Sequence, residues 1–199
     1  LDETFTVTVT AVNDEPSFTK GSDQTVLEDS GSSTITNWAT SISEGPSDES
    51  NQTLDFSVVN NNNTSLFSSQ PAISSLGVLT FTPQDNANGS AIVTINLSDS
   101  GGTANSGADD TSPNQTFTIT VTEDNDPVTL TAAIADYTVL EDATVSTVAD
   151  LDNIFGDIDI LNGASSALQE LNYSVLDNSD PDLATPNIDG NGLLTISYT

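Results

Sequence analysis

The apolar residues of this chain recur at every second position in short runs, and clusters of Asn, Asp, Gly, Ser and Pro separate the runs. Alternation with period two puts one set of side chains on each face of an extended strand, so each run predicts a β-strand with one buried face. The clearest run spans residues 4–10, where Phe5, Val7 and Val9 would face a core. The same pattern predicts strands at residues 26–28, 33–36, 53–59, 78–82, 91–98 and 116–122.

No stretch has a convincing helical period, and the short strands are separated by regular turn signals. This density of strands is typical of an all-β fold and predicts a β-sandwich.

The chain also repeats itself at a period of roughly 110 to 117 residues, the size of one sandwich domain. The matching segments are TFTVTVTAVNDEP at 4–16 and TFTITVTEDNDP at 116–127, TVLEDS at 25–30 and TVLEDA at 138–143, LDFSVVNNN from Leu54 and LNYSVLDNS from Leu171, and GVLTFT from Gly77 and GLLTIS from Gly192.

These repeats predict three parts. Residues 1–12 are the last strand of a preceding repeat, residues 13–124 form a complete repeat, and residues 125–199 form a second repeat that stops early. A sandwich without its final strands exposes apolar side chains and an unpaired edge, so we expect the second repeat to be marginal, partly disordered or completed by another chain. One hypothesis is that residues 4–10 are donated to this repeat of a neighbouring molecule.

The charge balance is extreme, because Lys20 is the single Lys or Arg against 30 Asp and Glu, which gives a net charge of −29. Such a surface repels nucleic acid and anionic lipid, and it attracts cations. The regular apolar runs, which contain the few aromatic residues, indicate a folded chain rather than a disordered acidic tail.

Cys and His are both absent, which removes disulfides and the usual ligands of zinc. Oxygen ligands remain, and they favour Ca²⁺ or Mg²⁺. No apolar stretch is long enough for a transmembrane helix, so direct membrane insertion is not expected. The chain begins inside a strand-like run without an initiator Met, so we expect an internal fragment whose export signal or anchor lies elsewhere.

Acidic residues recur at the ends of the predicted strands. Two linkers carry them before a proline, which restrains the backbone and presents the carboxylates: Asn13 and Asp14, and later Asp124, Asn125 and Asp126. The pair at 28–29 is repeated at 141–142, about twelve residues into its repeat. An extended strand of that length spans about 40 Å, so Glu28 should lie at the opposite end of the domain from Asn13.

Two further acidic positions complete the pattern. Asp99 precedes a pair of glycines in a tight turn, and alternation at Asp157 and Asp159 predicts both carboxylates on one side of an extended segment. The equivalent stretch of the first repeat is looser, with Glu44, Asp48 and Glu49. Carboxylates brought together repel one another unless a cation lies among them, and Ca²⁺ takes about six to eight such oxygens.

At these residues the chain resembles the cadherin-like tandem repeats of large secreted or surface proteins of bacteria, and more distantly animal cadherin repeats. The family carries a glutamate motif, an Asp-x-Asp pair, an Asp-Arg-Glu motif, an Ala-x-Asp turn and an Asn-Asp linker. These are matched here, respectively, by Leu27-Glu28-Asp29, Asp157-Ile158-Asp159, Gln84-Asp85-Asn86, Leu97-Ser98-Asp99 and the two Asn-Asp linkers. The resemblance covers nearly the whole chain and implies tandem Greek-key β-sandwiches, immunoglobulin-like in the broad sense.

The resemblance also implies calcium ligands. One junction would use Glu28, Asp85, Asp124, Asn125, Asp126, Asp157 and Asp159, and the other Asn13, Asp14 and Asp99, with Glu44 or Asp48 as further candidates. Asp85 lacks the Arg and Glu that follow it in the family, and the first repeat has no clean Asp-x-Asp pair. Fewer ions per junction than the family's usual three are therefore expected.

The expected function is that of a calcium-stiffened spacer or adhesion segment of an extracellular, secreted or cell-surface protein. Partners would be Ca²⁺ and a like domain, a carbohydrate or another cell-surface molecule, but not nucleic acid. Catalysis is not expected, since no His or Cys is present and the carboxylates lie in open polar loops.

Two alternatives remain open: a carbohydrate- or protein-binding module in which calcium assists recognition, and a plain sandwich whose acidic loops are solvated turns. Trp38 is expected in the core or at its rim rather than on a sugar-binding surface.

Overall fold

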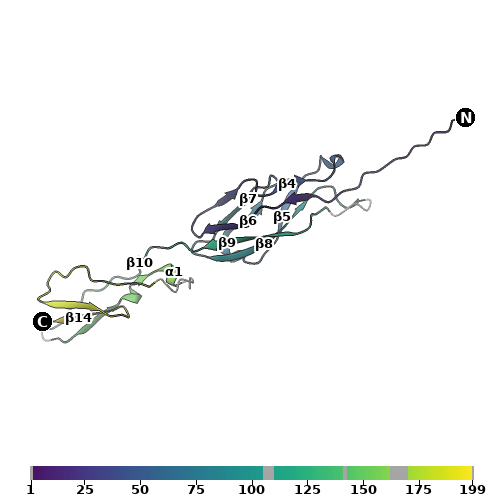
Figure 1. The fold of residues 1–199 in the computed structure, drawn as a ribbon. Coiled ribbons are helices and arrows are strands. Elements are labelled where there is room, and N and C mark those ends of the chain that lie inside the picture. The colour runs from purple at the N-terminus through teal and green to yellow at the C-terminus, as the bar shows by residue number, and fades with distance from the viewer. Residues whose placement is uncertain (1, 105–109, 141–142, 162–169, 199) are drawn as a thin grey trace. The chain divides into compact units, whose positions relative to one another are not determined.

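The computed structural model describes residues 2–104, 110–140, 143–161 and 170–198. The chain divides into two compact units, Leu1–Asp124 (unit 1) and Asn125–Thr199 (unit 2). The described residues are mainly β-strands in several sheets, with one four-residue α-helix, α1 (Ile158–Leu161), so the fold is all-β (Figure 1). None of the helices in the described part of the chain has the length and apolarity needed to cross a bilayer.

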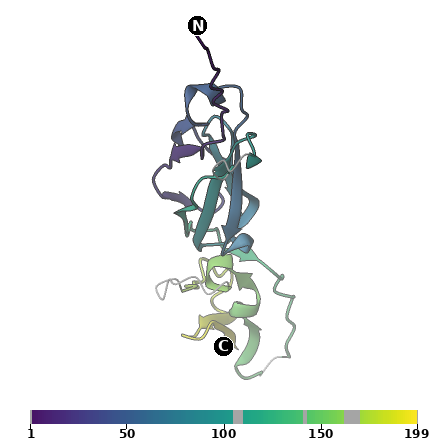
Figure 2. The ribbon, with the colours of Figure 1, turned by 90° about the vertical axis from the view of Figure 1, so that its right-hand side faces the viewer.

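The strands of unit 1 form three sheets. They are β1 (Ser17–Thr19), β2 (Gln24–Leu27), β3 (Ser33–Ile35), β4 (Thr40–Ser43), β5 (Asp55–Asn61), β6 (Phe67–Ile73), β7 (Leu79–Pro83), β8 (Gly89–Ser98) and β9 (Gln115–Thr122). The sheet orders are β2-β9-β8-β5, β3-β7-β6 and β1-β4, and β2 alone runs parallel to its neighbour, β9. Strands β8 and β9 lie side by side in the largest sheet (Figure 2).

One hydrophobic core draws side chains from both larger sheets. Alternate residues of β8 and β9 are buried, while β7 supplies Leu79 and Phe81 from the other sheet. Trp38 is buried with its ring centroid 4.5 Å from that of Phe117, which confirms its expected place in the core. The period-two pattern of the sequence is therefore the pattern of burial.

Six predicted strands are confirmed, with small shifts at their ends, as β2, β3, β5, β7, β8 and β9. Strands β1, β4 and β6 were not predicted. In β6 the sequence FSSQPAI has no polar-apolar alternation and contains Pro71, which is uncommon inside strands.

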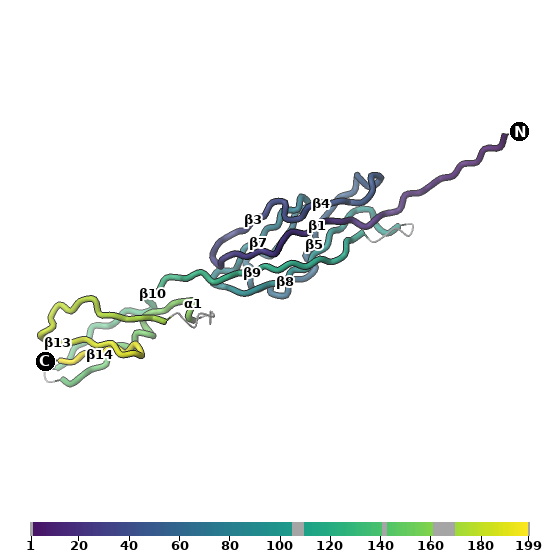
Figure 3. Tube along the Cα trace, in the orientation of Figure 1, coloured from purple at the N-terminus to yellow at the C-terminus, as the bar shows by residue number. Residues whose placement is uncertain are grey.

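The strand predicted at residues 4–10 is absent: the segment pairs with no other strand in the described part of the chain and extends away from the body of unit 1 (Figure 3). Phe5, Val7 and Val9 are 88%, 73% and 89% exposed. A strand needs a hydrogen-bonded neighbour, and in unit 1 the place of this sequence is taken by its near copy, β9, between β2 and β8.

Unit 2 repeats part of this plan. Its strands are β10 (Thr129–Leu130), β11 (Ser146–Asp150), β12 (Phe155–Gly156), β13 (Ala184–Ile188) and β14 (Leu193–Tyr198). The sheet β11-β14-β13 has the order of β3-β7-β6, and the register agrees: Ser146 lies opposite Ile196 as Ser33 lies opposite Phe81. No sheet of the described residues of unit 2 corresponds to β2-β9-β8-β5.

The predicted similarity between the segments from Leu54 and Leu171 does not extend to secondary structure. The first segment includes β5, which pairs with β8, whereas residues 170–178 form no strand. Without a neighbour like β8, this segment has no ladder to join.

Candidate metal centre

Most of the buried polar side chains of the described residues are predicted ligands, and Glu49 joins them. Apart from Ser112, they are Asn13, Glu28, Glu49, Asp99, Asp157 and Asp159. A buried carboxylate needs hydrogen bonds or a cation to offset the loss of its hydration. These residues fall into three groups, each within one unit.

The Asn13 cluster lies in unit 1 and comprises Asn13, Asp14, Glu49, Gln52 and Asp99. The Asn13 amide donates to both carboxylate oxygens of Asp99, at 3.3 and 3.4 Å, and its own oxygen accepts from Gln52 Nε2 at 2.8 Å. The backbone N–H of Asp14 donates to Glu49 Oε1 at 2.6 Å. Residues far apart in sequence are thus joined at the N-terminal linker.

Local structure places these side chains. Asp99 directly follows β8, and its carboxylate accepts from the backbone N–H of Gly101 at 2.9 Å, which closes a turn over the end of the strand. Glu49 closes a 3₁₀ turn, Ser47–Glu49, that follows Pro46. A side chain at Gly101 would clash with the Asn13 amide, so a larger residue there would displace that amide.

Two buried oxygens of the Asn13 cluster have no hydrogen-bond partner within the described residues: Glu49 Oε2 and Gln52 Oε1. Glu49 as a whole is only 5% exposed. Lys20, the one basic side chain of the protein, instead contacts the carbonyl of Gly21 at 3.5 Å. An unsatisfied buried acceptor is costly, so these two oxygens are suited to an external cation.

The Glu28 cluster comprises Glu28 and Asp124, with Asp29 beside them. Glu28 follows β2 and is 1% exposed, and its Oε1 accepts from the backbone N–H of Asp124 at 3.2 Å. The backbone N–H of Glu28 donates to the Thr122 carbonyl at 2.9 Å. Because Glu28 adjoins the end of β9 and Asp99 lies near its start, the two clusters lie at opposite ends of this strand.

The Asp126 cluster lies in unit 2 and comprises Asp126, Asp157 and Asp159. The backbone N–H of Asp126 donates to Asp159 Oδ2 at 2.8 Å, and that of Asp159 donates to Asp157 Oδ1 at 3.0 Å. Asp157 and Asp159 do not lie on an extended segment as predicted, because α1 begins at Ile158 and Asp157 accepts from its first turn. Both carboxylates are buried all the same.

The Asn13 and Asp126 clusters contain an equivalent hydrogen bond. In each cluster the backbone N–H of the Asp in the Asn-Asp pair donates to a carboxylate. Asp14 donates to Glu49 in unit 1, and Asp126 donates to Asp159 in unit 2. The separations are similar, at 35 and 33 residues. Glu49 therefore takes the place for which Glu44 and Asp48 were the candidates, and this matching of separations is the signal that could have identified it.

Other predicted ligands are less involved. Asp85 is exposed in the turn after β7, and its neighbour Asn86 donates a backbone hydrogen bond of 3.1 Å to Asp29 Oδ1. Asn125 is exposed, and its amide donates to the Asp126 carbonyl at 3.0 Å. Glu141 and Asp142, the repeat of Glu28 and Asp29, lie outside the described residues.

No three Asp or Glu side chains converge on one point, as around a preformed metal site, anywhere in the described ranges. The fit to Ca²⁺ therefore depends on mixed donors. The Asn13 cluster offers carboxylate and amide oxygens, both of which Ca²⁺ accepts, and water commonly completes its shell.

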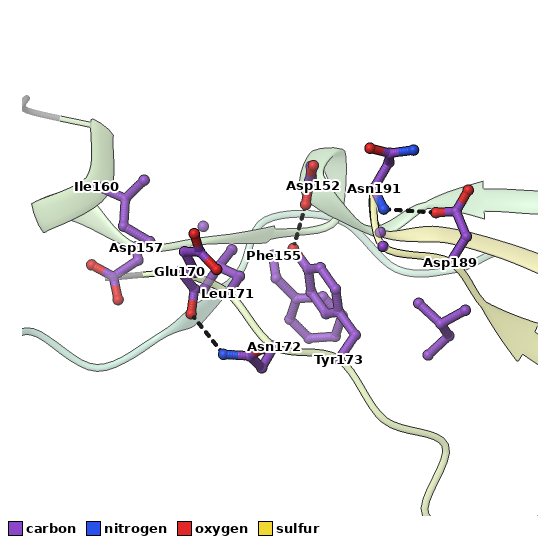
Figure 4. Close-up of a pocket in the computed structure, with 14 residues that line it drawn as sticks. Asp152, Phe155, Asp157, Ile160, Glu170, Leu171, Asn172, Tyr173, Asp189 and Asn191 are labelled. Atoms are coloured by element: carbon purple, nitrogen blue, oxygen red, sulfur yellow. Dashed lines mark hydrogen bonds between the residues drawn. The ribbon is translucent and has the colours of Figure 1, made fainter. Parts of the chain in front are cut away.

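Unit 2 also has a concave region, lined by acidic and aromatic side chains (Figure 4). Tyr173 donates a hydrogen bond of 2.8 Å to Asp152, and its ring centroid lies 5.9 Å from that of Phe155. Asp189 accepts backbone hydrogen bonds from Asn191 and Leu193, both at 2.9 Å, and these lower its pKa. Each of these polar groups thus fixes the local backbone or the position of a ring.

No protein-family model matches the chain, and no curated protein sequence matches it either.

Proposed function

We propose that the protein is a calcium-binding, cadherin-like module that acts as a stiffened spacer or adhesion segment of an extracellular protein. Its units would be Greek-key β-sandwiches, complete in unit 1, and its acidic clusters would bind Ca²⁺ rather than perform catalysis. Asn13, Asp14, Glu49, Gln52 and Asp99 would supply ligands in unit 1.

The observation that carries this proposal is the carboxylate of Glu49. It is 5% exposed, one of its oxygens has no hydrogen-bond donor within the described residues, and the chain carries a net charge of −29. Neither a neighbouring base nor a full set of donors offsets its burial. A divalent ion would do so.

Bound ions would stiffen the chain because the clusters hydrogen-bond to the backbone of the linker. The linker leaves unit 1 at Asp124, whose N–H is bonded to Glu28, and enters unit 2 at Asp126, whose N–H is bonded to Asp159. Ions that neutralise these carboxylates stabilise both attachments, so the backbone next to each unit loses freedom. Extracellular calcium modules bind with Kd values of about 0.1 to 1 mM, which suits a secreted or surface protein.

The test compares chelator-treated protein with and without millimolar Ca²⁺, by isothermal titration calorimetry and by thermal unfolding. We expect Ca²⁺ binding to raise the Tm, because an ion that binds the folded state alone stabilises it. The substitution Glu49→Gln removes a charged ligand with little change in volume. It should weaken binding of the ion in unit 1 by about tenfold or more.

Asp48→Asn is the matched control, since Asp48 is exposed and adjoins Glu49. It removes the same charge and should leave the affinity close to that of the wild type. Equal calcium affinities for the Glu49→Gln and wild-type proteins, or no heat on adding Ca²⁺, would contradict the proposal.

A further inference from the structure

The sheet β11-β14-β13 of unit 2 is less covered than its counterpart in unit 1, β3-β7-β6. In β7 of unit 1, Leu79 and Phe81 are 0% and 1% exposed, because the core side chains of β8 and β9 cover them. Their counterparts in β14, Leu194 and Ile196, are only partly buried. The face of unit 2 that corresponds to a covered face of unit 1 is therefore open.

Part of this face is concave and mainly apolar, although Asp126, Asp157 and Glu170 also line it. It forms a groove of about 720 Å³. Its apolar lining residues include Ile134, Leu151, Phe155, Val175, Ile188 and Leu194. Residues 137–140 also belong to no strand, although their counterparts Gln24–Leu27 form β2, and Tyr137 and Leu140 are exposed. Unit 2 thus presents a mainly apolar groove and, at residues 137–140, a segment that joins no sheet of the described residues.

The chain contains a segment with the matching pattern. Residues 4–10, TFTVTVT, differ from residues 116–122 of β9, TFTITVT, only by Val7 in place of Ile119. In β9 the apolar set, Phe117, Ile119 and Val121, is buried. The corresponding Phe5, Val7 and Val9 are 88%, 73% and 89% exposed on a segment without a partner strand in the described residues.

We propose that residues 4–10 of one copy of this chain bind as a strand to unit 2 of a second copy. Phe5, Val7 and Val9 would enter the groove, and the backbone would pair in parallel with residues 137–140. This is strand addition to an exposed edge, in which the ladder gives affinity and alternate side chains give specificity. The proposal is independent of calcium binding.

Unit 1 specifies the register. There β2 pairs in parallel with β9, with Thr25 opposite Thr120 and Val26 opposite Val121. Because Thr25 corresponds to Thr138 and Thr120 to Thr8, Thr8 of the donor should lie opposite Thr138 of the acceptor. The neighbouring pairs would be Tyr137 with Val7, Val139 with Val9, and Leu140 with Thr10.

The first test measures mass against protein concentration by sedimentation velocity, in chelator at near-physiological ionic strength. The wild type should associate reversibly as concentration rises. The double variant Val7→Asp, Val9→Asp should stay monomeric, since each charge would enter the groove. Thr6→Asp with Thr8→Asp is the matched control: it adds the same charge to the opposite strand face and should retain association.

The second test uses the absence of native cysteine. Under mild oxidation, a Thr8→Cys variant mixed with a Thr138→Cys variant should form a disulfide-linked heterodimer, because paired strand residues are close enough for a disulfide. Thr8→Cys mixed with Thr25→Cys should not, since in unit 1 that position is already paired with β9. A wild type that remains monomeric at every concentration, or equal association of the two aspartate variants, would overturn the proposal.

Discussion

At the scale of single residues, Tyr173 gives the clearest electrostatic expectation. Burial, and then its hydrogen bond to Asp152 and the charge of that carboxylate, raise the pKa of Tyr173 to about 12. Its ordinary pKa is about 10, so folding favours the neutral phenol. The stabilisation from this shift is complete below about pH 10 and is lost as the pH rises towards 12.

Titration of tyrosinate absorbance checks this. The protein has three tyrosines, and we expect one to ionise later than the others. Tyr173→Phe should abolish the late step, and Asp152→Asn should move it to lower pH. Tyr137→Phe is the control and should leave it, because Tyr137 is half exposed and bears no such bond in the described structure. A single common titration of all three would contradict the assignment.

The local conformation around a residue could be predicted where it depends on neighbouring residues in the sequence. Asp99 lies before Gly101 and Gly102 in a turn that is readable from sequence, and the structure buries it there. Glu49 was passed over because its partner, Asp14, is 35 residues away and no local motif connects them. Whether these groups bind calcium stays a prediction.

At the scale of elements, β8 shows how alternation specifies a strand. Ala91, Val93, Ile95 and Leu97 are fully buried, whereas Ile92, on the opposite face, is 48% exposed. The strand lies between β9 and β5, so both its edges are hydrogen-bonded, and its inner face belongs to the core that also contains Leu79 and Phe81 of β7. Burial on one face alone is what period-two patterning predicts.

The two isoleucines of β8 provide a matched pair. Ile95→Ala should lower the free energy of unfolding of unit 1 by about 2 to 5 kcal/mol, because it leaves a cavity in the core. Ile92→Ala deletes the same atoms from a half-exposed site and should cost less than about 1 kcal/mol. Urea unfolding followed by Trp38 fluorescence measures both, and equal losses would show that the faces of β8 are wrongly assigned.

The strand predicted at residues 4–10 is absent for a reason that comparison with β9 makes clear. A strand is defined by its neighbours as well as by its own sequence, so residues 4–10 and β9 are nearly identical yet only β9 forms a ladder. The short helix α1 was also missed, because four residues are too few to show a helical period. By contrast, the repeated motif GLLTIS does form a strand, β14, and its counterpart in unit 1 is β7.

At the scale of the whole molecule, the two units differ in how much core they bury. Among the described residues, the buried hydrophobic side chains belong to unit 1, with the exception of Leu151. Hydrophobic burial is the main favourable term in folding, so unit 2 should be much less stable. The chain as a whole should then not unfold in a single two-state transition.

Urea unfolding with two probes tests this difference. Trp38 is the one tryptophan of the chain and lies in the core of unit 1, so its fluorescence reports on that unit alone, whereas far-ultraviolet circular dichroism reports on both. We expect part of the circular dichroism signal to be lost at lower urea than the fluorescence change. The measurement is best made on the Val7→Asp, Val9→Asp variant, in which strand addition would not stabilise unit 2. Adding Ile95→Ala should move only the later transition to lower urea, because that residue belongs to the core of unit 1. Coincident transitions that move together would mean that the units unfold as one.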